Sequence, residues 1–346
     1  MKLLNNLFSR RKRIVVIGLD GVPFSFVNKL VKNGELTNFN KLINEGDIKR
    51  MNSVYPAVSS VAWSSFMTGK NPGGHNIYGF IDRPEGSHEL YIPNGNYLKS
   101  KTIFEIVGED KKRVLSMNVP VTYPPRTING TLIAGFLSPS IDKATYPERV
   151  SVLLKKMGYR IDADPWKGRE KDKSAFLEDI FITFKKRVEA FFYLWENDDW
   201  DYLHLHIMET DRINHFLWEH WERNLKYAQE FLKFYKEIDN FLGEVRQRIS
   251  EDTEFIVLSD HGFCEVEKEI YLNYSLIEKG WLVLKNDNSK SLKDIHKESK
   301  AYSLIPGRIY INLKGRELEG NVKMGKEYED IREGIIEDLN NLKEPE

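Results

Sequence analysis

Residues 14–21 have the sequence IVVIGLDG, an apolar run rich in β-branched side chains that ends at Asp20 and Gly21. A continuous apolar run of this length predicts a strand that is buried on both faces, as the strands of parallel sheets are. Residues 254–262, EFIVLSDHG, repeat this pattern of an apolar strand followed by an aspartate and a glycine. The sequence therefore predicts one buried strand and a second apolar strand, each with an acidic loop at its carboxyl end.

Predicted helices alternate with predicted strands along the rest of the chain. Further strands are expected over 113–121, 132–138 and 201–208, and long amphipathic helices over 176–196 and 224–249. This alternation predicts an α/β fold with a mostly parallel central sheet flanked by helices.

Two stretches depart from the alternation. Residues 140–175 are polar and rich in Lys, Asp and aromatic side chains, and we expect them to form a small inserted cap element. Residues 307–320, GRIYINLKGRELEG, predict a hairpin or a strand pair. The run of basic residues near the start predicts that 1–13 form a solvated arm ahead of the first strand, leaving 14–346 as one domain.

The composition limits the classes of partner. The 51 Lys and Arg residues nearly balance the 52 Asp and Glu residues, so charge gives no reason to expect a nucleic-acid polymer or a membrane surface as partner. The single cysteine, Cys264, excludes a disulfide framework and a multi-cysteine zinc site. With no signal-peptide pattern and no long apolar span, the expected location is the cytoplasm. Nothing in the sequence indicates the oligomeric state.

Acidic and histidine side chains collect where the predicted strands end. Asp20, Asp211 and the pair Asp260–His261 each follow a predicted strand, and ligands of parallel sheets bind at this edge. Asp211 and His215 are four residues apart, so a helix places them on one face. Each of these residues alone could instead be a helix cap or part of a surface pair. Together, oxygen and nitrogen donors without thiolates suit Zn²⁺, with Mn²⁺ and Fe²⁺ as alternatives.

A serine-rich segment lies between these acids. Residues 55–69, YPAVSSVAWSSFMTG, predict a helix that begins just after Ser59 and ends at Gly69. A hydroxyl at a helix N-terminus lies in a positive dipole field, which favours the ionised oxygen that a nucleophile needs. Ser59 is therefore the candidate nucleophile, and Ser60 is the alternative.

The order and spacing of the motifs VVIGLDG, PAVSSVAWSSFMTGKNPGGHNIYGF, TDRINH, LSDHGF and GRIYINLKGRELEGNV resemble those of the type I phosphodiesterase/nucleotide pyrophosphatase family, in the alkaline phosphatase superfamily. The resemblance covers nearly the whole chain and implies an alkaline phosphatase-like catalytic domain over 14–346. It implies a metal-dependent hydrolase of small phosphodiesters or pyrophosphates that works through a phosphoserine at Ser59. It also implies two divalent ions, one held by Asp20, Ser59, Asp260 and His261, and one held by Asp211, His215 and a further histidine.

The sequence departs from the family pattern at that further histidine, which lies near the C-terminus in the family. No histidine follows His296 here, so we expect the chain to lack the family's C-terminal segment. His206 could take the place of the missing ligand, although a histidine inside a strand is more often packed. Two other interpretations stay open: a phosphate or phosphonate monoesterase of the same superfamily, and a non-catalytic binding protein with a degenerate second metal site.

Overall fold

The computed structural model describes residues 12–286 and 292–343, which divide into two compact units. The larger unit contains the described residues up to Gly79 together with Pro93–Glu265, and the smaller unit contains Phe80–Ile92 and the described residues from Val266 onward. Most of the predicted basic arm lies outside the described residues, and Arg13 is already the first residue of a strand.

The larger unit is built on a six-stranded sheet in the order β4-β3-β2-β5-β1-β6. Its strands are β1 (Arg13–Leu19), β2 (Val114–Met117), β3 (Gly130–Ile133), β4 (Thr145–Tyr146), β5 (Tyr202–Ile207) and β6 (Thr253–Leu258). All neighbouring strands are parallel except β4, which pairs antiparallel with β3. The predicted α/β fold with a mostly parallel central sheet is confirmed.

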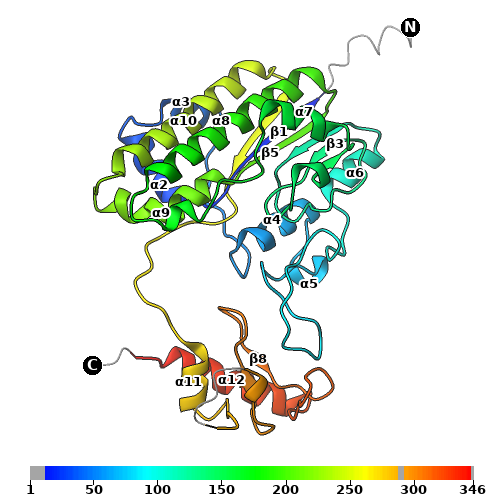
Figure 1. Cartoon of the computed structure of the whole chain (residues 1–346), viewed down its shortest axis with the longest axis vertical. Helices are drawn as coiled ribbons and strands as arrows, with labels where there is room; N and C mark the ends of the chain where they lie inside the picture. The colour runs from blue at the N-terminus through cyan, green and yellow to red at the C-terminus, as the bar shows by residue number, and fades with distance from the viewer. Residues whose placement is uncertain (1–11, 287–291, 344–346) are drawn as a thin grey trace. The chain divides into compact units, whose positions relative to one another are not determined.

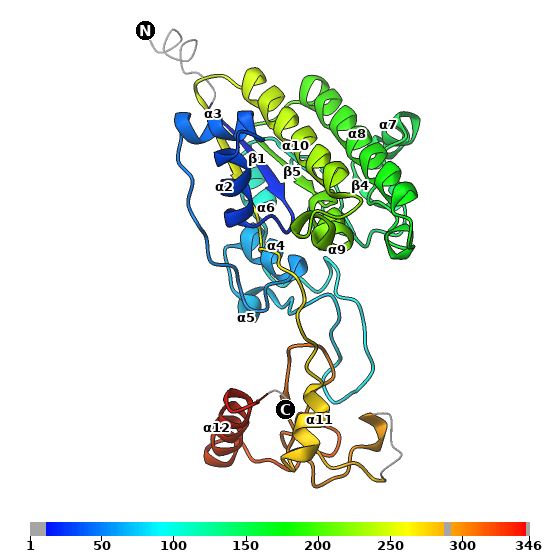
Figure 2. The ribbon, with the colours of Figure 1, turned by 90° about the vertical axis from the view of Figure 1, so that its left-hand side faces the viewer.

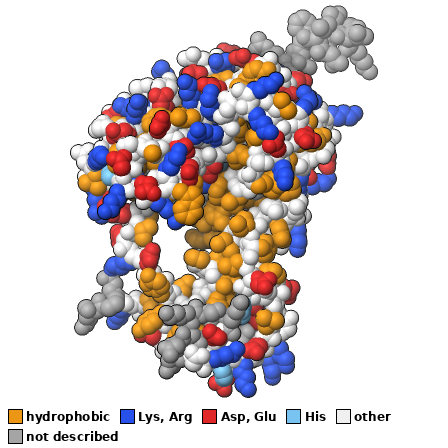
Figure 3. Space-filling view, viewed as in Figure 1, with side chains coloured by type: hydrophobic (Ala, Val, Ile, Leu, Met, Phe, Trp, Pro, Cys, Tyr) orange, Lys and Arg blue, Asp and Glu red, His pale blue; other side chains and the backbone are white. Residues whose placement is uncertain are grey.

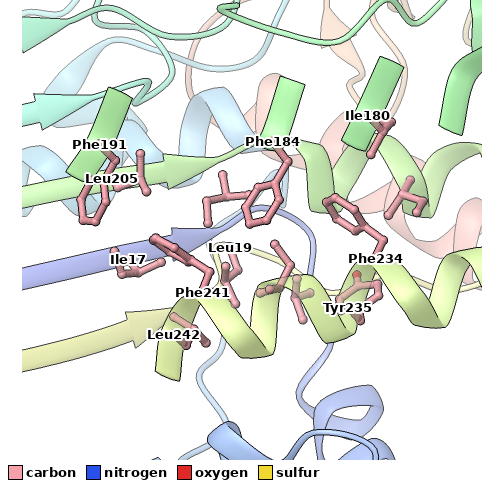
Figure 4. Close-up of a cluster of buried hydrophobic side chains, with 14 of the residues drawn as sticks. Ile17, Leu19, Ile180, Phe184, Phe191, Leu205, Phe234, Tyr235, Phe241 and Leu242 are labelled. Carbon is pink, nitrogen blue, oxygen red and sulfur yellow. The ribbon is translucent and has the colours of Figure 1, made fainter. Parts of the chain in front are cut away.

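One face of the sheet carries most of the helices. These are α2 (Phe24–Lys32), α3 (Thr37–Glu45), α7 (Val150–Met157), α8 (Ser174–Asn197), α9 (Glu209–Glu222) and α10 (Ala228–Arg248). Figures 1 and 2 show α8 and α10 lying side by side across the sheet. Their aromatic residues Phe184 and Phe241 pack with Ile17, Leu19 and Leu205 of the strands, as Figure 4 shows.

The opposite face is covered by α4 (Ser59–Thr68) and α6 (Ile103–Glu109), with the short α5 (Pro72–His75) following α4. Trp63 of α4 is fully buried and packs in a second core with Val16 of β1. Gly18 makes room for it, because a Cβ at this position would lie 2.3 Å from Cη2 of the indole ring. β1 contributes side chains to both cores, and this explains why its sequence is continuously apolar.

Two local expectations have clear outcomes. The helix predicted to begin just after Ser59 and end at Gly69 is α4, and Gly69 follows it in the left-handed conformation, with φ +64°. The stretch 140–175 contains the 3₁₀-helices η1 (Ile141–Lys143) and η2 (Lys167–Arg169) as well as β4 and α7. It therefore supplies the antiparallel edge of the central sheet and a helix of its main layer.

The smaller unit has a core of its own. It contains α11 (Leu272–Glu278), η3 (Leu292–Asp294), β7 (Ala301–Tyr302), β8 (Tyr310–Ile311) and α12 (Lys326–Asn340). The strand expected within 307–320 is β8, and it pairs antiparallel with the preceding β7. Residues 80–92 join this unit through Arg83, whose buried guanidinium lies 2.7 Å from the Glu317 carboxylate.

Basic and acidic side chains are mixed over α8 and α10 on the face that Figure 3 shows. This pattern agrees with the balanced composition. In the described part of the chain, no helix is both long enough and apolar enough to cross a bilayer.

Candidate active site

The carboxyl ends of β1 and β6 meet the N-terminus of α4 at one edge of the larger unit's sheet. Asp20 directly follows β1, Asp260 lies two residues beyond β6, and Ser59 is the first residue of α4. The backbone N–H of Gly21 donates a hydrogen bond to Oδ1 of Asp260 over 3.1 Å, which ties the two strand-end loops together. Three segments that are distant in sequence thus bring polar side chains to one point.

The hydroxyl of Ser59 faces the point where these three segments meet. Its Oγ donates a hydrogen bond to Oδ1 of Asp20 over 2.9 Å and lies 3.2 Å from Nε2 of His261. The serine is buried at the start of the helix, where the unpaired N–H groups favour negative charge. The adjacent Ser60 is also buried, but its Oγ has no hydrogen-bond partner among the described residues. Of the two candidate serines, Ser59 is thus the one whose hydroxyl contacts Asp20 and His261.

His261 presents Nε2 to the site. Its Nδ1 donates to the carbonyl oxygen of Gly262 over 2.8 Å, which leaves Nε2 near Ser59 and 3.4 Å from Oδ1 of Asp20. In the neutral imidazole this Nε2 carries the lone pair that a metal ligand needs. The backbone contact of Nδ1 therefore orients the ring for ligation.

The three ionisable groups at this point perturb one another strongly. Burial opposes ionisation of Asp20, but hydrogen bonds with His206 and His261 outweigh it and hold the Asp20 pKa below its ordinary value. Burial, together with the charge of Asp20, raises the pKa of Asp260 well above its usual range. Burial also disfavours the charged form of His261, yet the neighbouring carboxylates raise its pKa to about 10. The cluster therefore favours additional positive charge.

A divalent cation fits this cluster. One ligand atom from each of Asp20, Asp260 and His261 lies within 4.8 Å of the others. Oδ2 of Asp260 is buried without a hydrogen-bond partner in the described residues, 3.6 Å from Nε2 of His261. A buried carboxylate oxygen that lacks a donor is expected where a cation binds, because such an oxygen is otherwise costly. The set of two carboxylates and an imidazole suits Zn²⁺.

Asp211 and His215 form a separate pair on α9. Nε2 of His215 lies 3.3 Å from Oδ1 of Asp211, with Asp211 buried and the His215 side chain 54% exposed. Gly21 separates this pair from the first cluster: its φ is +66°, and a Cβ there would lie 3.0 Å from Oδ1 of Asp211 and 3.2 Å from Cε1 of His261. Glycine therefore allows the two groups of ligands to come close. His206, the alternative third ligand, instead contacts Asp20.

Two other residues of the TDRINH motif hold the start of α9 against the loop after β1. Oγ1 of Thr210 donates to the carbonyl oxygen of Asp20 over 2.7 Å, and Nδ2 of Asn214 donates to that of Gly21 over 2.8 Å. Thr210 and Asn214 are four residues apart, one position before Asp211 and His215. The motif TDRINH thus contains two helical pairs, one directed at the backbone after β1 and one available to a ligand.

A fully buried ion pair anchors the same turn to α8. Arg187 donates to Glu209, the first residue of α9, through Nε over 2.9 Å and through Nη2 over 2.7 Å. Arg187 also donates to the hydroxyl of Tyr159 over 2.8 Å. The two-point geometry restricts how α9 can rotate, and hence where Asp211 lies.

Two side chains contact Asp20 in a way that the sequence did not predict. Nε2 of His206 lies 2.7 Å from Oδ2 of Asp20, and Nε1 of Trp63 donates to the same oxygen over 2.9 Å. A histidine inside a strand is more often packed, and both residues are completely buried. The available signal was the position of His206 on the strand that precedes TDRINH.

Residues 14–346 match the family model for type I phosphodiesterase / nucleotide pyrophosphatase. The chain belongs to this family. No curated protein matches this family member.

Two solved structures of phosphonoacetate hydrolase from Sinorhizobium meliloti 1021 share the fold of this type I phosphodiesterase/nucleotide pyrophosphatase family member. The complex with phosphonoformate aligns with a TM-score of 0.58 at 20% identity, and the complex with phosphonoacetate with a TM-score of 0.55 at 18% identity. Each alignment covers 78% of this chain and 62% of the hydrolase chain, so this chain spans less than two thirds of the hydrolase. The expected alkaline phosphatase-like fold is thereby confirmed.

Proposed function

We propose that this family member is a metal-dependent hydrolase of small phosphoric esters with Ser59 as its nucleophile. The observation that carries the proposal is the position of the Ser59 hydroxyl, 2.9 Å from Asp20 and 3.2 Å from His261, beside a buried Asp260 oxygen without a hydrogen-bond donor. A nucleophile beside a cluster suited to a cation is the arrangement that phosphoryl transfer needs.

The proposed reaction has two displacements at phosphorus. The Ser59 hydroxyl loses its proton and its Oγ forms a bond to phosphorus as the bond to the leaving oxygen breaks. The leaving oxygen takes up a proton, which gives a phosphorylated serine and the released alcohol or phosphate. Water then attacks the same phosphorus, the bond to Oγ breaks, and the serine hydroxyl is restored with a proton. Two inversions give net retention of configuration. Bound divalent ions would lower the pKa of the hydroxyl and neutralise charge on the transferring group.

The residues proposed to hold the ions follow the geometry. Asp20, Asp260 and His261, with Ser59, are proposed for one ion, and Asp211 with His215 for a second, with Zn²⁺ as the preferred metal. Asp211 and His215 supply only part of a coordination shell, so substrate or water must complete it. A non-catalytic protein with a degenerate second site is the alternative if only the first ion binds.

The proposed substrates are small diesters or pyrophosphates, as the family description suggests. A phosphate or phosphonate monoester is the alternative, because the neighbours that share the fold are complexes of a phosphonoacetate hydrolase with phosphonates. The single cysteine supports the cytoplasm as the proposed location.

The test compares hydrolysis of bis-p-nitrophenyl phosphate, p-nitrophenyl phosphate and phosphonoacetate after chelation and after return of Zn²⁺ or Mn²⁺. We expect metal-dependent cleavage of the diester that Ser59→Ala lowers by at least about a thousandfold, as loss of a covalent nucleophile does in other hydrolases. Ser60→Ala is the matched control and should keep most of the activity. Cleavage that persists in Ser59→Ala, or that is lost only in Ser60→Ala, would contradict the assignment.

A further inference from the structure

We propose that His206 is a positioning residue for Asp20: it fixes one carboxylate oxygen in the interior so that the other is presented to the cation. The inference rests on the proposed function, because it concerns how this chain holds the ion near Ser59. It assigns a role to a buried histidine that lies outside the two proposed ligand sets.

The two oxygens of Asp20 have different environments. Oδ2 lies 2.7 Å from Nε2 of His206 and accepts a hydrogen bond from Nε1 of Trp63 over 2.9 Å. Oδ1 instead faces the site, where it accepts from Ser59 over 2.9 Å and lies 3.4 Å from Nε2 of His261. The carboxylate is therefore divided into an interior oxygen and a site oxygen.

His206 is the donor in its contact with Asp20. Both side chains are completely buried, and Nδ1 of His206 has no hydrogen-bond partner in the described part of the chain. A hydrogen on Nδ1 would be a buried donor without an acceptor, whereas a hydrogen on Nε2 is satisfied by Oδ2 of Asp20. The imidazole N–H thus points at the interior oxygen.

The pairing of β1 with β5 and the packing of Trp63 hold His206 against Asp20. In the parallel pairing of β1 with β5, His206 is the partner of Gly18, two residues before Asp20. Gly18 has no side chain, so the Trp63 ring occupies the space above it and lies edge-on to the His206 ring, with centroids 4.8 Å apart at 82°. Neither donor can move without displacing the other ring or a strand of the sheet.

This restriction affects metal binding directly. A carboxylate with two free oxygens can rotate about χ2 or chelate an ion through both atoms, whereas one whose Oδ2 is held offers a single oxygen at a fixed position. Hydrogen bonds of this kind to metal ligands commonly change metal affinity by about 10- to 100-fold. Removing the His206 donor should therefore weaken the ion while leaving all the proposed ligands in place.

The chain supplies a matched control in His204. It lies two residues earlier on β5, is equally buried, and packs against the same indole ring at 5.7 Å between centroids. Both of its ring nitrogens lack hydrogen-bond partners among the described residues, so it donates no hydrogen bond to Asp20. His204→Leu and His206→Leu thus make the same change of side chain on the same face, and only the second removes a donor from Asp20.

The experiment measures Zn²⁺ affinity by competition with a chromophoric chelator, without substrate, on the full chain. We expect His206→Leu to raise the Kd for Zn²⁺ at the tighter site by at least about tenfold, and His204→Leu to change it by less than about threefold. His206→Gln, whose amide nitrogen can occupy the place of Nε2, should restore the affinity to within about threefold of wild type. Thermal unfolding of the zinc-free proteins reports whether each variant is folded.

Equal zinc affinity in wild type and His206→Leu, or an equal loss in His204→Leu, would overturn the inference while leaving the proposed function intact. A wild-type chain that binds no Zn²⁺ and no Mn²⁺ would overturn both. If His206→Leu does not fold, Trp63→Phe provides the second test, because it removes the other donor to Oδ2 and keeps an aromatic ring. Unchanged zinc affinity in a folded Trp63→Phe would then reject the inference that holding Oδ2 of Asp20 positions the carboxylate for the ion.

Discussion

Asn214 links the core of α10 to the loop that carries the candidate site: its amide donates to the carbonyl oxygen of Gly21, and its oxygen accepts from the buried hydroxyl of Tyr235 over 2.8 Å. Asn214 is itself completely buried. One side chain thus satisfies two buried polar groups from different elements, and the position of Gly21 depends on it.

Asn214→Leu should lower the free energy of unfolding by about 1–3 kcal/mol, because it leaves both the Gly21 carbonyl and the Tyr235 hydroxyl without a partner. Urea unfolding measures the change. In a Tyr235→Phe background the same substitution should cost less, since one of the two orphaned groups is then absent. Equal costs in the two backgrounds would show that the contact with Tyr235 contributes nothing.

The buried pair Arg187–Glu209 should behave as a unit. Arg187→Met alone is expected to lower stability by about 3–5 kcal/mol, because it leaves the Glu209 carboxylate buried without a counter-charge. The double variant Arg187→Met/Glu209→Leu should recover a large part of this loss. A double-mutant cycle by denaturant unfolding measures the coupling, and strictly additive costs would argue against it.

His204 should make the protein sensitive to acid. Burial, with a smaller effect from the neighbouring imidazole of His206, lowers the pKa of His204 to about 3. Because the folded-state pKa lies below the unfolded value of 6.5, the folded state disfavours the proton, and stability is lost as pH falls below about 6.5. Between pH 7.5 and 5 this group should account for about 2 kcal/mol of the loss.

His204→Leu should remove that share of the acid sensitivity. The measurement is the free energy of unfolding of both proteins at the two pH values, and the comparison is the difference between their losses. Because each protein is its own reference at pH 7.5, any direct effect of the leucine on packing cancels. Equal losses of unfolding free energy in the two proteins would show that protonation of His204 does not contribute to the acid sensitivity.

Zinc should stabilise the folded chain through Asp260. A ligand that binds only the folded state at a hundred times its Kd adds about 2.7 kcal/mol, so Zn²⁺ should raise Tm by several degrees and a chelator should reverse the rise. Asp260→Asn removes a proposed ligand while keeping the size of the side chain, and it should lose most of the zinc-dependent shift. Asp252→Asn, outside the cluster, serves as the control. A full shift in Asp260→Asn would exclude this carboxylate from the metal site.

Gly18 and Trp63 should tolerate substitution only together. Gly18→Ala places a methyl group 2.3 Å from the indole ring and should cost about 1–3 kcal/mol or more by overpacking. Trp63→Leu frees that space but leaves a cavity, so the double variant should be more stable than the sum of the single losses predicts. Additive losses in a thermal-unfolding cycle would show that the ring can move away from β1.

The sheet and the main acidic residues were predictable because they depend on local sequence. The apolar runs before Asp20 and before Asp260 identify two strands, and parallel strands place their carboxyl ends at one edge. Only β1 is largely buried, because β6 lies at the end of the sheet and its residues are half-buried or exposed. The start of α4 at Ser59 was predictable for the same reason. The contact between the two strand-end loops was not predictable, because the hydrogen bond between Gly21 and Asp260 joins residues 239 positions apart.

The contacts around Asp20 could not be predicted from the pattern of apolar and polar residues in the sequence. A histidine inside an apolar strand is normally packed, and His204 is, whereas His206 on the same face reaches a carboxylate 186 positions away. Only the register of β5 against β1 distinguishes His204 from His206, and this register cannot be predicted from the sequence of either strand alone. Likewise, residues 140–175 lack a clear strand pattern because β4 is only two residues long and lies at the sheet edge.

The smaller unit is built from two separate stretches of the chain, and this has a consequence for biosynthesis. Arg83 is translated 234 residues before Glu317, the carboxylate that neutralises it in the folded unit. During that interval the sheet of the larger unit can be completed, because its last strand, β6, ends at Leu258. During synthesis, the larger unit can therefore fold on the ribosome while residues 80–92 still lack their partners from the later part of the smaller unit.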